Sequence, residues 1–165
     1  MKNNLSVRLA NAKDIPLIRS IAEDVWPPTY APILTKPQIS YMMEMMYSKS
    51  ALEDQMNTGH RFIIVYSDEI PMGFASYSQI EPGVYKLHKI YVSIKNQGTG
   101  AGNFLLNYII KDLRDVKASA LLLNVNRNNK AKGFYEKKGF RTVKTEDIDI
   151  GNGFYMNDYV MKLDI

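Results

Sequence analysis

The stretch Leu87–Leu113, LHKIYVSIKNQGTGAGNFLLNYIIKDL, decides how the rest of the chain is arranged. Its pattern predicts a buried strand over Leu87–Ser93, a glycine-rich turn over Gln97–Gly102 and an amphipathic helix over Asn103–Leu113. Glycine at every second position of the turn lets backbone N–H groups point the same way and lets a ligand approach the main chain closely. The helix that follows presents the positive end of its dipole to the same place. The stretch therefore predicts an anion site, most directly for a pyrophosphate.

Several interpretations of this turn compete. A P-loop would end in Gly-Lys-Ser/Thr, but Gly102 is followed by Asn103 and Phe104. A dinucleotide-binding fingerprint would place a glycine where Asn103 stands, and an acid near the end of the next strand, Ala120–Asn126, which carries none. A tight turn without any ligand is the third interpretation.

The fourth interpretation is a resemblance to a known family. Gln97-x-x-Gly100-x-Gly102 is similar to the Gln/Arg-x-x-Gly-x-Gly/Ala acyl-CoA pyrophosphate loop of the GCN5-related N-acetyltransferase (GNAT) family. Downstream, NNKAKGFYEKKGF at Asn128–Phe140 resembles that family's Asn-x-x-Ala-x-x-Phe-Tyr-x-Lys-x-Gly-Phe segment. Two motifs in the right order, a helix and a strand apart, are more specific than either alone. The resemblance covers the whole chain, residues 1–165, as a single N-acetyltransferase domain.

The resemblance implies acetyl-CoA as the cofactor and direct transfer of its acetyl group to an amine. Backbone N–H groups of the turn would hold the pyrophosphate, and a backbone N–H of Tyr91 or Val92 would hold the oxyanion. Asn128 would contact the CoA arm or cap a helix, and Lys132 would assist with phosphate charge or remain a solvated lysine. The implied cofactor-binding residues are Tyr91, Val92, Gln97, Gly98, Thr99, Gly100, Ala101, Gly102, Asn103, Asn128, Lys132 and Tyr135.

Two residues are candidates for proton transfer. The resemblance implies Tyr135 as the acid that protonates the departing thiolate, and a phenol, with an ordinary pKa of about 10, carries its proton at neutral pH. A packing aromatic beside Phe134 is the alternative. Many relatives carry a glutamate base four residues before the position of Val92, where this chain has His88. Histidine is a competent base at neutral pH, but a strand histidine held by a neighbouring hydrogen bond is an equal alternative.

The acceptor is expected to meet the N-terminal helices and the C-terminal loop. Trp26, Tyr30 and Tyr155 are the candidate substrate-binding residues. A methionine stripe at Met42, Met43 and Met46 has a helical spacing more typical of plain core. Acidic residues at 147, 149 and 158 would attract a cationic amine, although a solvated loop is the stronger interpretation.

The end of the chain gives a lead on the substrate. The segment Gly151–Met161 resembles the end of bacterial acetyltransferases of the spermidine/spermine type, which implies a polyamine or another small primary amine as the acceptor. A protein N-terminus or lysine side chain as acceptor, and a non-catalytic acyl-CoA sensor, remain as alternatives. The absence of cysteine favours direct transfer without a covalent acyl-enzyme.

The composition limits which classes of protein and which kinds of site remain. The hydrophobic content of 45% and charged content of 23% are typical of a soluble globular chain. With no cysteine and only two histidines, we expect no disulfide and no metal site. The net charge of +4 suits a polyanionic cofactor, but no basic run indicates nucleic acid. No apolar run is long enough to span a membrane, and Met1–Asn4 lacks a signal-peptide core, so we expect a cytoplasmic protein. The family resemblance allows a homodimer.

The pattern along the chain predicts an α/β (α+β) fold, a GNAT-like mixed, mostly antiparallel central sheet with helices on both faces. In that family the sheet splays between the strands that correspond to Val84–Ser93 and Ala120–Asn126, and acyl-CoA enters the gap. Prolines in Trp26–Pro32 predict a loop, Asp147–Gly153 predicts a loop or hairpin connection, and Asn128 predicts the cap of a helix over Asn129–Lys138. Capping boxes predict helix starts at Thr35–Gln38 and Ser50–Glu53. The other expected helix is Asp14–Val25, and the other expected strands are Leu5–Leu9, Arg61–Tyr66, Met72–Ile80, Phe140–Thr145 and Tyr155–Leu163.

Overall fold

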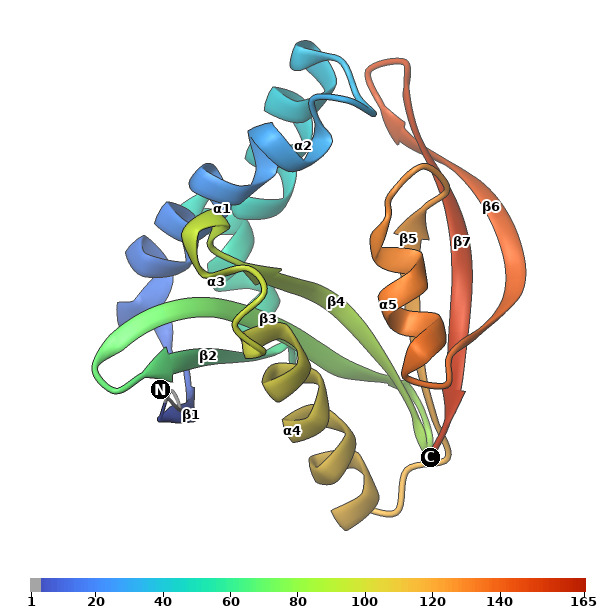
Figure 1. Cartoon of the computed structure of the whole chain (residues 1–165). Helices are drawn as coiled ribbons and strands as arrows, with labels where there is room; N and C mark the ends of the chain where they lie inside the picture. The colour runs from blue at the N-terminus through green and yellow to red at the C-terminus, as the bar shows by residue number, and fades with distance from the viewer. Residues whose placement is uncertain (1–3) are drawn as a thin grey trace.

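Within residues 4–165, which the computed structural model describes, seven strands form one mixed sheet in the order β1-β2-β3-β4-β5-β7-β6 (Figure 1). Neighbouring strands are antiparallel except β4 and β5, which are parallel. The expectation about a signal peptide rests partly on Met1–Asn3, which lie outside the described residues. The strands are β1 (Leu5–Leu9), β2 (Arg61–Ser67), β3 (Ile70–Glu81), β4 (Val84–Val92), β5 (Ala120–Asn126), β6 (Arg141–Gly151) and β7 (Phe154–Asp164).

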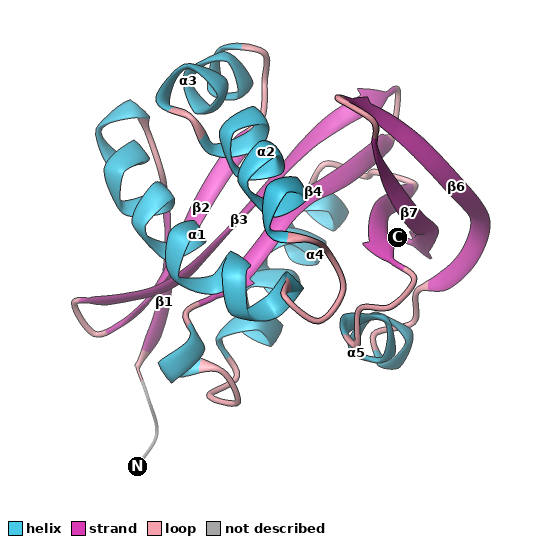
Figure 2. Cartoon of the chain, turned by 90° about the horizontal axis from the view of Figure 1, so that it is seen from above, coloured by secondary structure: helices cyan, strands magenta, loops and turns pink. Residues whose placement is uncertain are grey.

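Helices cover both faces of the sheet (Figure 2). On one face, α1, α2 and α3 enclose a core that includes Trp26, Tyr47 and Phe74. On the other face, α4 and α5 pack over a second core that includes Leu105 and Met161. This arrangement confirms the mixed, mostly antiparallel α/β sheet predicted from the sequence. The helices are α1 (Ile15–Tyr30), α2 (Lys36–Tyr47), α3 (Lys49–Asn57), α4 (Ala101–Asp115) and α5 (Ala131–Lys137), with short 3₁₀ turns at Ala12–Asp14 and Ile94–Asn96.

The loop expected at Trp26–Pro32 is wrong for its first five residues, because α1 continues through Pro27 and Pro28 to Tyr30. Proline removes a backbone donor and disfavours a helix interior. Trp26 and Tyr30 lie one turn apart on the same helix face and are only 1% and 8% exposed. Burial of these two large rings therefore outweighs the local cost of the prolines.

Three other element boundaries also differ from expectation. The third helix begins at Lys49, with Ser48 Oγ accepting from Ala51 N–H at 3.2 Å, so the box predicted two residues later is wrong. Asn128 does not cap α5; instead Asn129 Oδ1 accepts from Ala131 N–H at 2.9 Å. Strand β6 runs on to Gly151, so most of the predicted 147–153 connection is strand and only a tight turn joins it to β7.

A β-bulge interrupts β4 at the middle of the sheet. Ser76 pairs with Lys89 and Tyr77 pairs with Leu87, so His88 is an extra residue on β4 with no partner on β3. A bulge bends its strand and changes the direction of the side chains beside it. The His88 ring stacks on His60 and the Lys89 ammonium lies over the Tyr47 ring, so both side chains reach the region where α2 and α3 cover the sheet.

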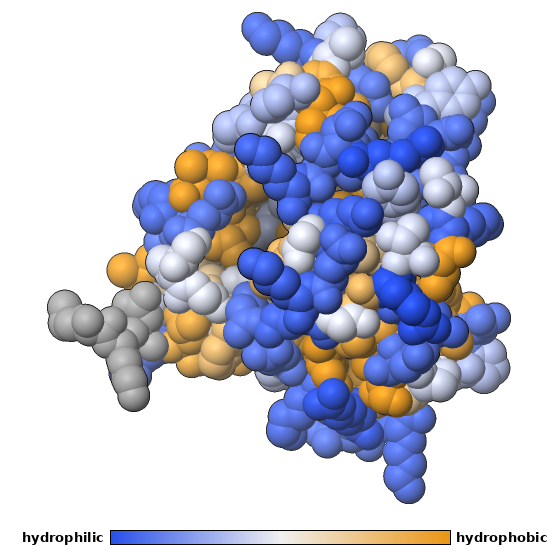
Figure 3. Space-filling model, turned by 45° about the vertical axis from the view of Figure 1, so that its right-hand side comes forward, coloured by the Kyte–Doolittle hydropathy of each residue, from blue (hydrophilic) through white to orange (hydrophobic). Residues whose placement is uncertain are grey.

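The surface shown in Figure 3 is mostly hydrophilic, with apolar residues in separate patches between hydrophilic ones. Among residues 4–165, no helix has the length and apolar character needed to cross a membrane.

Candidate active site

The two central strands separate part-way along their length. Parallel pairing joins β4 to β5 only from Val84↔Ala120 to Leu87↔Leu123. Figure 1 shows the two strands together near the C-terminus and apart at their other ends. A cleft of about 800 Å³ opens at this point, and α1, β4, β5 and β7 contribute to its walls. The splay expected from the family resemblance is therefore present.

The glycine-rich turn fits a pyrophosphate. Gly98 and Gly100 have φ angles of 81° and 88°, a conformation that other residues rarely adopt. The first helical hydrogen bond of α4 runs from Phe104 N–H to Gly100 O, at 2.9 Å. The backbone N–H groups of residues 101–103 have no acceptor within the described chain, so they point out of the helix as free donors. Such an N-terminus binds phosphate oxygens.

Side chains of the turn hold its shape. Gln97 Nε2 donates to Val92 O at 3.3 Å, and Thr99 Oγ1 donates to Asn96 O at 2.6 Å. Gln97 also lines the cleft. The predicted loop residues thus come together at the end of β4, as the motif requires.

The two polar residues predicted from the second motif have different surroundings. Asn128 lines the cleft, where its backbone N–H donates to Asn126 Oδ1 at 2.9 Å. Lys132 is not among the residues that line the cleft, and its ammonium lies 4.5 Å from the centre of the Tyr159 ring. Asn128 thus lies at the cleft, whereas the Lys132 ammonium lies against Tyr159.

Tyr135 lies in the wall of the cleft at the middle of α5. It is 8% exposed, and its ring packs edge-on against Phe134 and Phe140. Burial, with a smaller effect of Tyr30, raises the pKa of the phenol well above its usual range. Tyr135 therefore carries its proton throughout the physiological range and is available as a donor.

The backbone of β4 offers a donor toward the gap. Ser93 N–H donates to Met72 O on the β3 side, at 2.8 Å. Because backbone groups alternate along a strand, Val92 presents its N–H to the opposite edge, where β5 has separated. Of the two backbone N–H groups predicted as oxyanion donors, that of Val92 is therefore the one that faces the gap.

The side chain of Tyr91 belongs to an aromatic wall. Its hydroxyl lies 2.9 Å from that of Tyr30, and the Trp26 ring packs at a tilt against the rings of both tyrosines. Trp26 is held in place by a 3.2 Å hydrogen bond from its indole nitrogen to Tyr47 OH. The predicted substrate residues Trp26 and Tyr30 thus line the cleft, and so does Tyr155, which is 49% exposed at the rim.

His88 lines the cleft but is constrained. Its Nε2 shares a 2.7 Å hydrogen bond with Ser78 Oγ, and its ring stacks on His60 with centroids 4.1 Å apart. Burial, together with the charges of His60, Lys86 and Lys89, lowers the pKa of His88 to about 3. A base is most effective when its pKa lies near the working pH, so this environment weakens His88 for that task.

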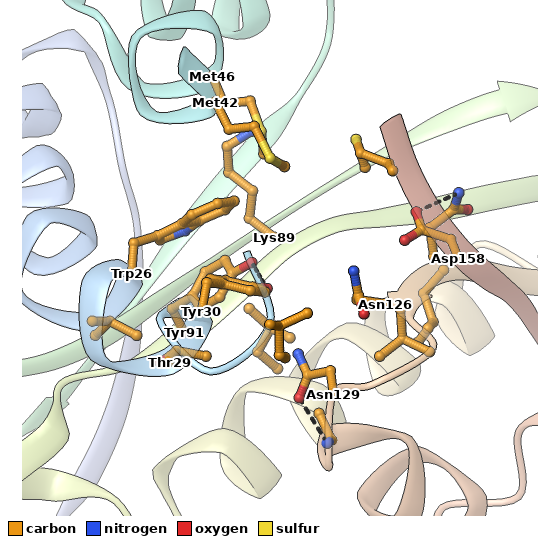
Figure 4. A pocket seen from close by; sticks show the side chains of 18 of the residues that line it. Trp26, Thr29, Tyr30, Met42, Met46, Lys89, Tyr91, Asn126, Asn129 and Asp158 are labelled. Atoms are coloured by element: carbon orange, nitrogen blue, oxygen red, sulfur yellow. Dashed lines mark hydrogen bonds between the residues drawn. The ribbon is translucent and has the colours of Figure 1, made fainter. Parts of the chain in front are cut away.

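Two cleft residues were missed or misjudged by the sequence interpretation. Asp158 lies on β7, within a strand expected from the sequence, but it is only 3% exposed rather than solvated as expected. It accepts from Asn124 Nδ2 at 3.3 Å, and burial raises the pKa of its carboxyl. Lys89, not singled out, is 5% exposed, and burial lowers the pKa of its ammonium to about 8. Both side chains face the cleft from opposite walls (Figure 4).

Contacts from α2 to the β6–β7 hairpin cross one end of the cleft. Tyr41 OH donates to Ile150 O at 2.6 Å, and Gln38 Nε2 donates to Tyr155 O at 2.8 Å. Gly151 lets the hairpin approach, because a Cβ there would lie 2.7 Å from Tyr41 OH. Gln38 and Tyr155 also line the cleft, so the junction of α2 with the hairpin lies at its edge.

The geometry matches a known family. A family model described as an acetyltransferase (GNAT) domain matches residues 30–163. The chain belongs to the GNAT family. It is therefore an N-acetyltransferase that uses acetyl-CoA.

Curated relatives of this GNAT enzyme are distant. A probable N-acetyltransferase of Mycobacterium tuberculosis is 27% identical over 146 residues, which cover 84% of this chain and 80% of the relative. An uncharacterized N-acetyltransferase of Mycobacterium bovis is 25% identical over 150 residues, or 90% of this chain and 96% of the relative.

Solved structures share the fold at low sequence identity. The paiA N-acetyltransferase from Thermoplasma acidophilum, in complex with coenzyme A, has a TM-score of 0.82 at 24% identity, covering 98% of this chain and 99% of that one. The ribosomal-protein-S18-alanine N-acetyltransferase from Escherichia coli has a TM-score of 0.75 at 18% identity, covering 98% and 94%.

Proposed function

We propose that this GNAT enzyme transfers the acetyl group directly to a primary amine of a small molecule. The bridge from α2 to the β6–β7 hairpin carries this proposal, because it crosses the acceptor side of the cleft. A polypeptide acceptor would need an open groove there. The aromatic wall formed by Trp26, Tyr30 and Tyr91 suits the hydrophobic part of a compact acceptor.

The cofactor side of the reaction follows from the loop and from β4. Acetyl-CoA, when bound, supplies an acetyl group activated as a thioester. The free N–H groups at the start of α4 and the Gly98–Gly100 backbone bind its pyrophosphate. Val92 N–H donates to the carbonyl oxygen as negative charge develops on it. Tyr135 donates its proton to the departing sulfur, because its pKa keeps the phenol protonated.

Removal of the amine proton falls to Asp158 in this proposal. Among the described residues that line the cleft, Asp158 is the only acidic one. A buried carboxylate attracts an ammonium group, and its raised pKa makes it a better proton acceptor than an exposed aspartate. The other candidate base, His88, stays in the proposal as a polar residue of the wall, and its role as base remains a prediction to test beside Asp158.

The charged residues of the cleft can be compared with the predicted polyamine acceptor. Lys86, Lys89 and Lys130 line it together with the single carboxylate of Asp158. A polyamine carries several positive charges and would meet more repulsion than attraction there. Within the class of small amines, these charges therefore favour an acceptor other than a polycation.

Thiol release from acetyl-CoA across a panel of amines tests the proposed function. The panel contains spermidine, amino acids and their amides, an aminoglycoside and a short peptide with a free N-terminus. Turnover with small amines and not with the peptide is the expected result. Faster turnover of the peptide would favour a protein acceptor and contradict the closed acceptor side.

A further inference from the structure

A basic cluster lies at the acceptor end of the cleft, and two of its members, His60 and Lys89, have no part in the chemistry described above. It consists of His60, His88 and Lys89, all of which line the cleft. Figure 4 shows the Lys89 side chain extending toward Met42 and Met46 of α2, away from Asn129 and α5. The cluster is thus on the acceptor side rather than beside the pyrophosphate turn.

Several polar groups in and beside this cluster have no hydrogen-bond partner among the described residues. Lys89 has no hydrogen bond or ion pair within residues 4–165, and its ammonium lies over the Tyr47 ring, 5.1 Å from the ring centre. His60 Nδ1 and Gln55 Oε1 are buried without a hydrogen-bond partner among the described residues. Buried polar groups are normally hydrogen-bonded, so an unpaired set lining a cleft indicates a polar ligand group.

The charge of the cluster is one-sided. Burial and the charge of Lys89 lower the pKa of His60. Burial and the charges of His60, Lys86 and Lys89 lower the pKa of His88. The only carboxylate lining the described cleft, on Asp158, lies on the opposite wall (Figure 4). At neutral pH these lowered pKa values leave both imidazoles uncharged, so the cluster offers the Lys89 ammonium and imidazole N–H groups, which together are complementary to an anion.

Stability gives no reason to keep Lys89 in this place. Removing an ammonium from water is costly unless a counter-charge and hydrogen bonds compensate. The single cation–π contact with Tyr47 compensates only in part. A buried, unpaired charge in a binding cleft is more directly explained by the ligand that it meets.

We propose that the acceptor carries an anionic group, a carboxylate or a phosphate, in addition to its amine, and that Lys89 and His60 bind this group. Lys89 provides a full positive charge with three donors, and His60 donates through Nδ1 in the tautomer protonated there. Asp158 holds the ammonium group on the opposite wall, so the two ends of the acceptor are recognised by opposite charges. This inference rests on the proposed function of the cleft.

Matched acceptor pairs test the anion site. The pairs are 6-aminohexanoate with 6-aminohexanamide, phenylalanine with phenylalaninamide, and 2-aminoethyl phosphate with ethanolamine. The wild-type protein, Lys89→Met and the control Lys111→Met are compared by kcat/KM for thiol release. Lys111 is an exposed lysine of α4 in a surface ion pair with Asp115, so its replacement controls for loss of one positive charge.

We expect wild type to favour the anionic member of at least one pair by about tenfold or more, the effect of one charge-assisted hydrogen bond. Lys89→Met should bring this ratio close to one, and Lys111→Met should leave it unchanged. Preference within the phosphate pair alone identifies a phosphate, and preference within the amino-acid pairs identifies a carboxylate. Equal use of both members of every pair by wild type, or an unchanged ratio in Lys89→Met, overturns the proposal.

A binding measurement separates this inference from the proposed function. The N-acetylated form of each pair is titrated calorimetrically into the protein with CoA present, so that no turnover is needed. Tighter binding of the anionic member by wild type, lost in Lys89→Met, supports the site even if every acceptor is silent in the activity assay. Such silence would refute acetyl transfer to these amines, whereas equal affinities within every pair would refute the anion site.

Discussion

Replacing Lys89 with methionine is expected to stabilise the folded protein at neutral pH. Burial lowers the pKa of Lys89 from the 10.5 of an exposed lysine to about 8. A tenfold change in proton affinity is worth about 1.4 kcal/mol, so the charged form is disfavoured by roughly 3 kcal/mol in the folded state. Methionine has a similar length and no charge. After allowing about 0.5–2 kcal/mol for the lost contact with Tyr47, a net gain of about 1–3 kcal/mol is expected.

The effect of Lys89 on the free energy of unfolding depends on pH. Between pH 8 and 10.5, the unfolded chain binds more protons at Lys89 than the folded chain does. The free energy of unfolding of wild type should therefore rise with pH in this window relative to that of Lys89→Met. The destabilising effect of the lysine is complete below pH 8 and disappears above 10.5.

Urea unfolding at pH 7 and pH 9.5 measures both effects. The stability advantage of Lys89→Met should shrink by about 2 kcal/mol between these two pH values. Titration of other lysines and tyrosines affects both proteins alike and cancels in the difference. A lower stability for Lys89→Met at pH 7, or a difference independent of pH, would refute the view of Lys89 as an unpaired buried charge.

Four further substitutions address the chemistry and the cofactor site. Tyr135→Phe should lower kcat by about 10²- to 10⁴-fold and leave the acetyl-CoA Kd from calorimetry nearly unchanged; weaker binding with normal turnover would contradict the acid role. Asp158→Asn should lower kcat/KM at pH 7 by about 10²-fold or more. The loss in kcat/KM should become smaller at alkaline pH, where the amine is already deprotonated. His88→Gln should lower kcat/KM less than Asp158→Asn does. If parallel pH profiles showed that His88→Gln lowers kcat/KM more than Asp158→Asn does, His88 rather than Asp158 would be the base. Gly100→Val should abolish acetyl-CoA binding, because φ is 88° at this position; an unchanged Kd would show that the turn does not hold the pyrophosphate.

Local sequence determined much of the cofactor half of the site. The alternation of glycines in Gln97–Gly102 directly before a helical pattern specifies a turn with free N–H groups, because this geometry depends on residues adjacent in the chain. The segment around Tyr135 is likewise local, and its resemblance to a family motif is enough to identify the candidate acid. Alternating and buried apolar runs predicted the strands for the same reason.

Long-range packing decided the acceptor half. Helix α1 passes through Pro27 and Pro28 because Trp26 and Tyr30 gain burial in the core, a contribution that propensity does not contain. The bulge at His88 is a register shift between two strands, so it depends on how β3 pairs with β4.

Asp158 and Lys89 show most clearly what local sequence leaves open and tertiary packing decides. In the sequence, one is an acid near the end of the chain and the other a lysine in an apolar strand. The fold places them on opposite walls of one cleft and removes both from water, which raises the pKa of the aspartate and lowers that of the lysine. The sequence indicated an enzyme that uses acetyl-CoA, because each of the two motifs that carry the family resemblance is contiguous in the chain. Only the tertiary structure decided which charges meet the acceptor, because they come from strands far apart in the chain and their energies depend on burial.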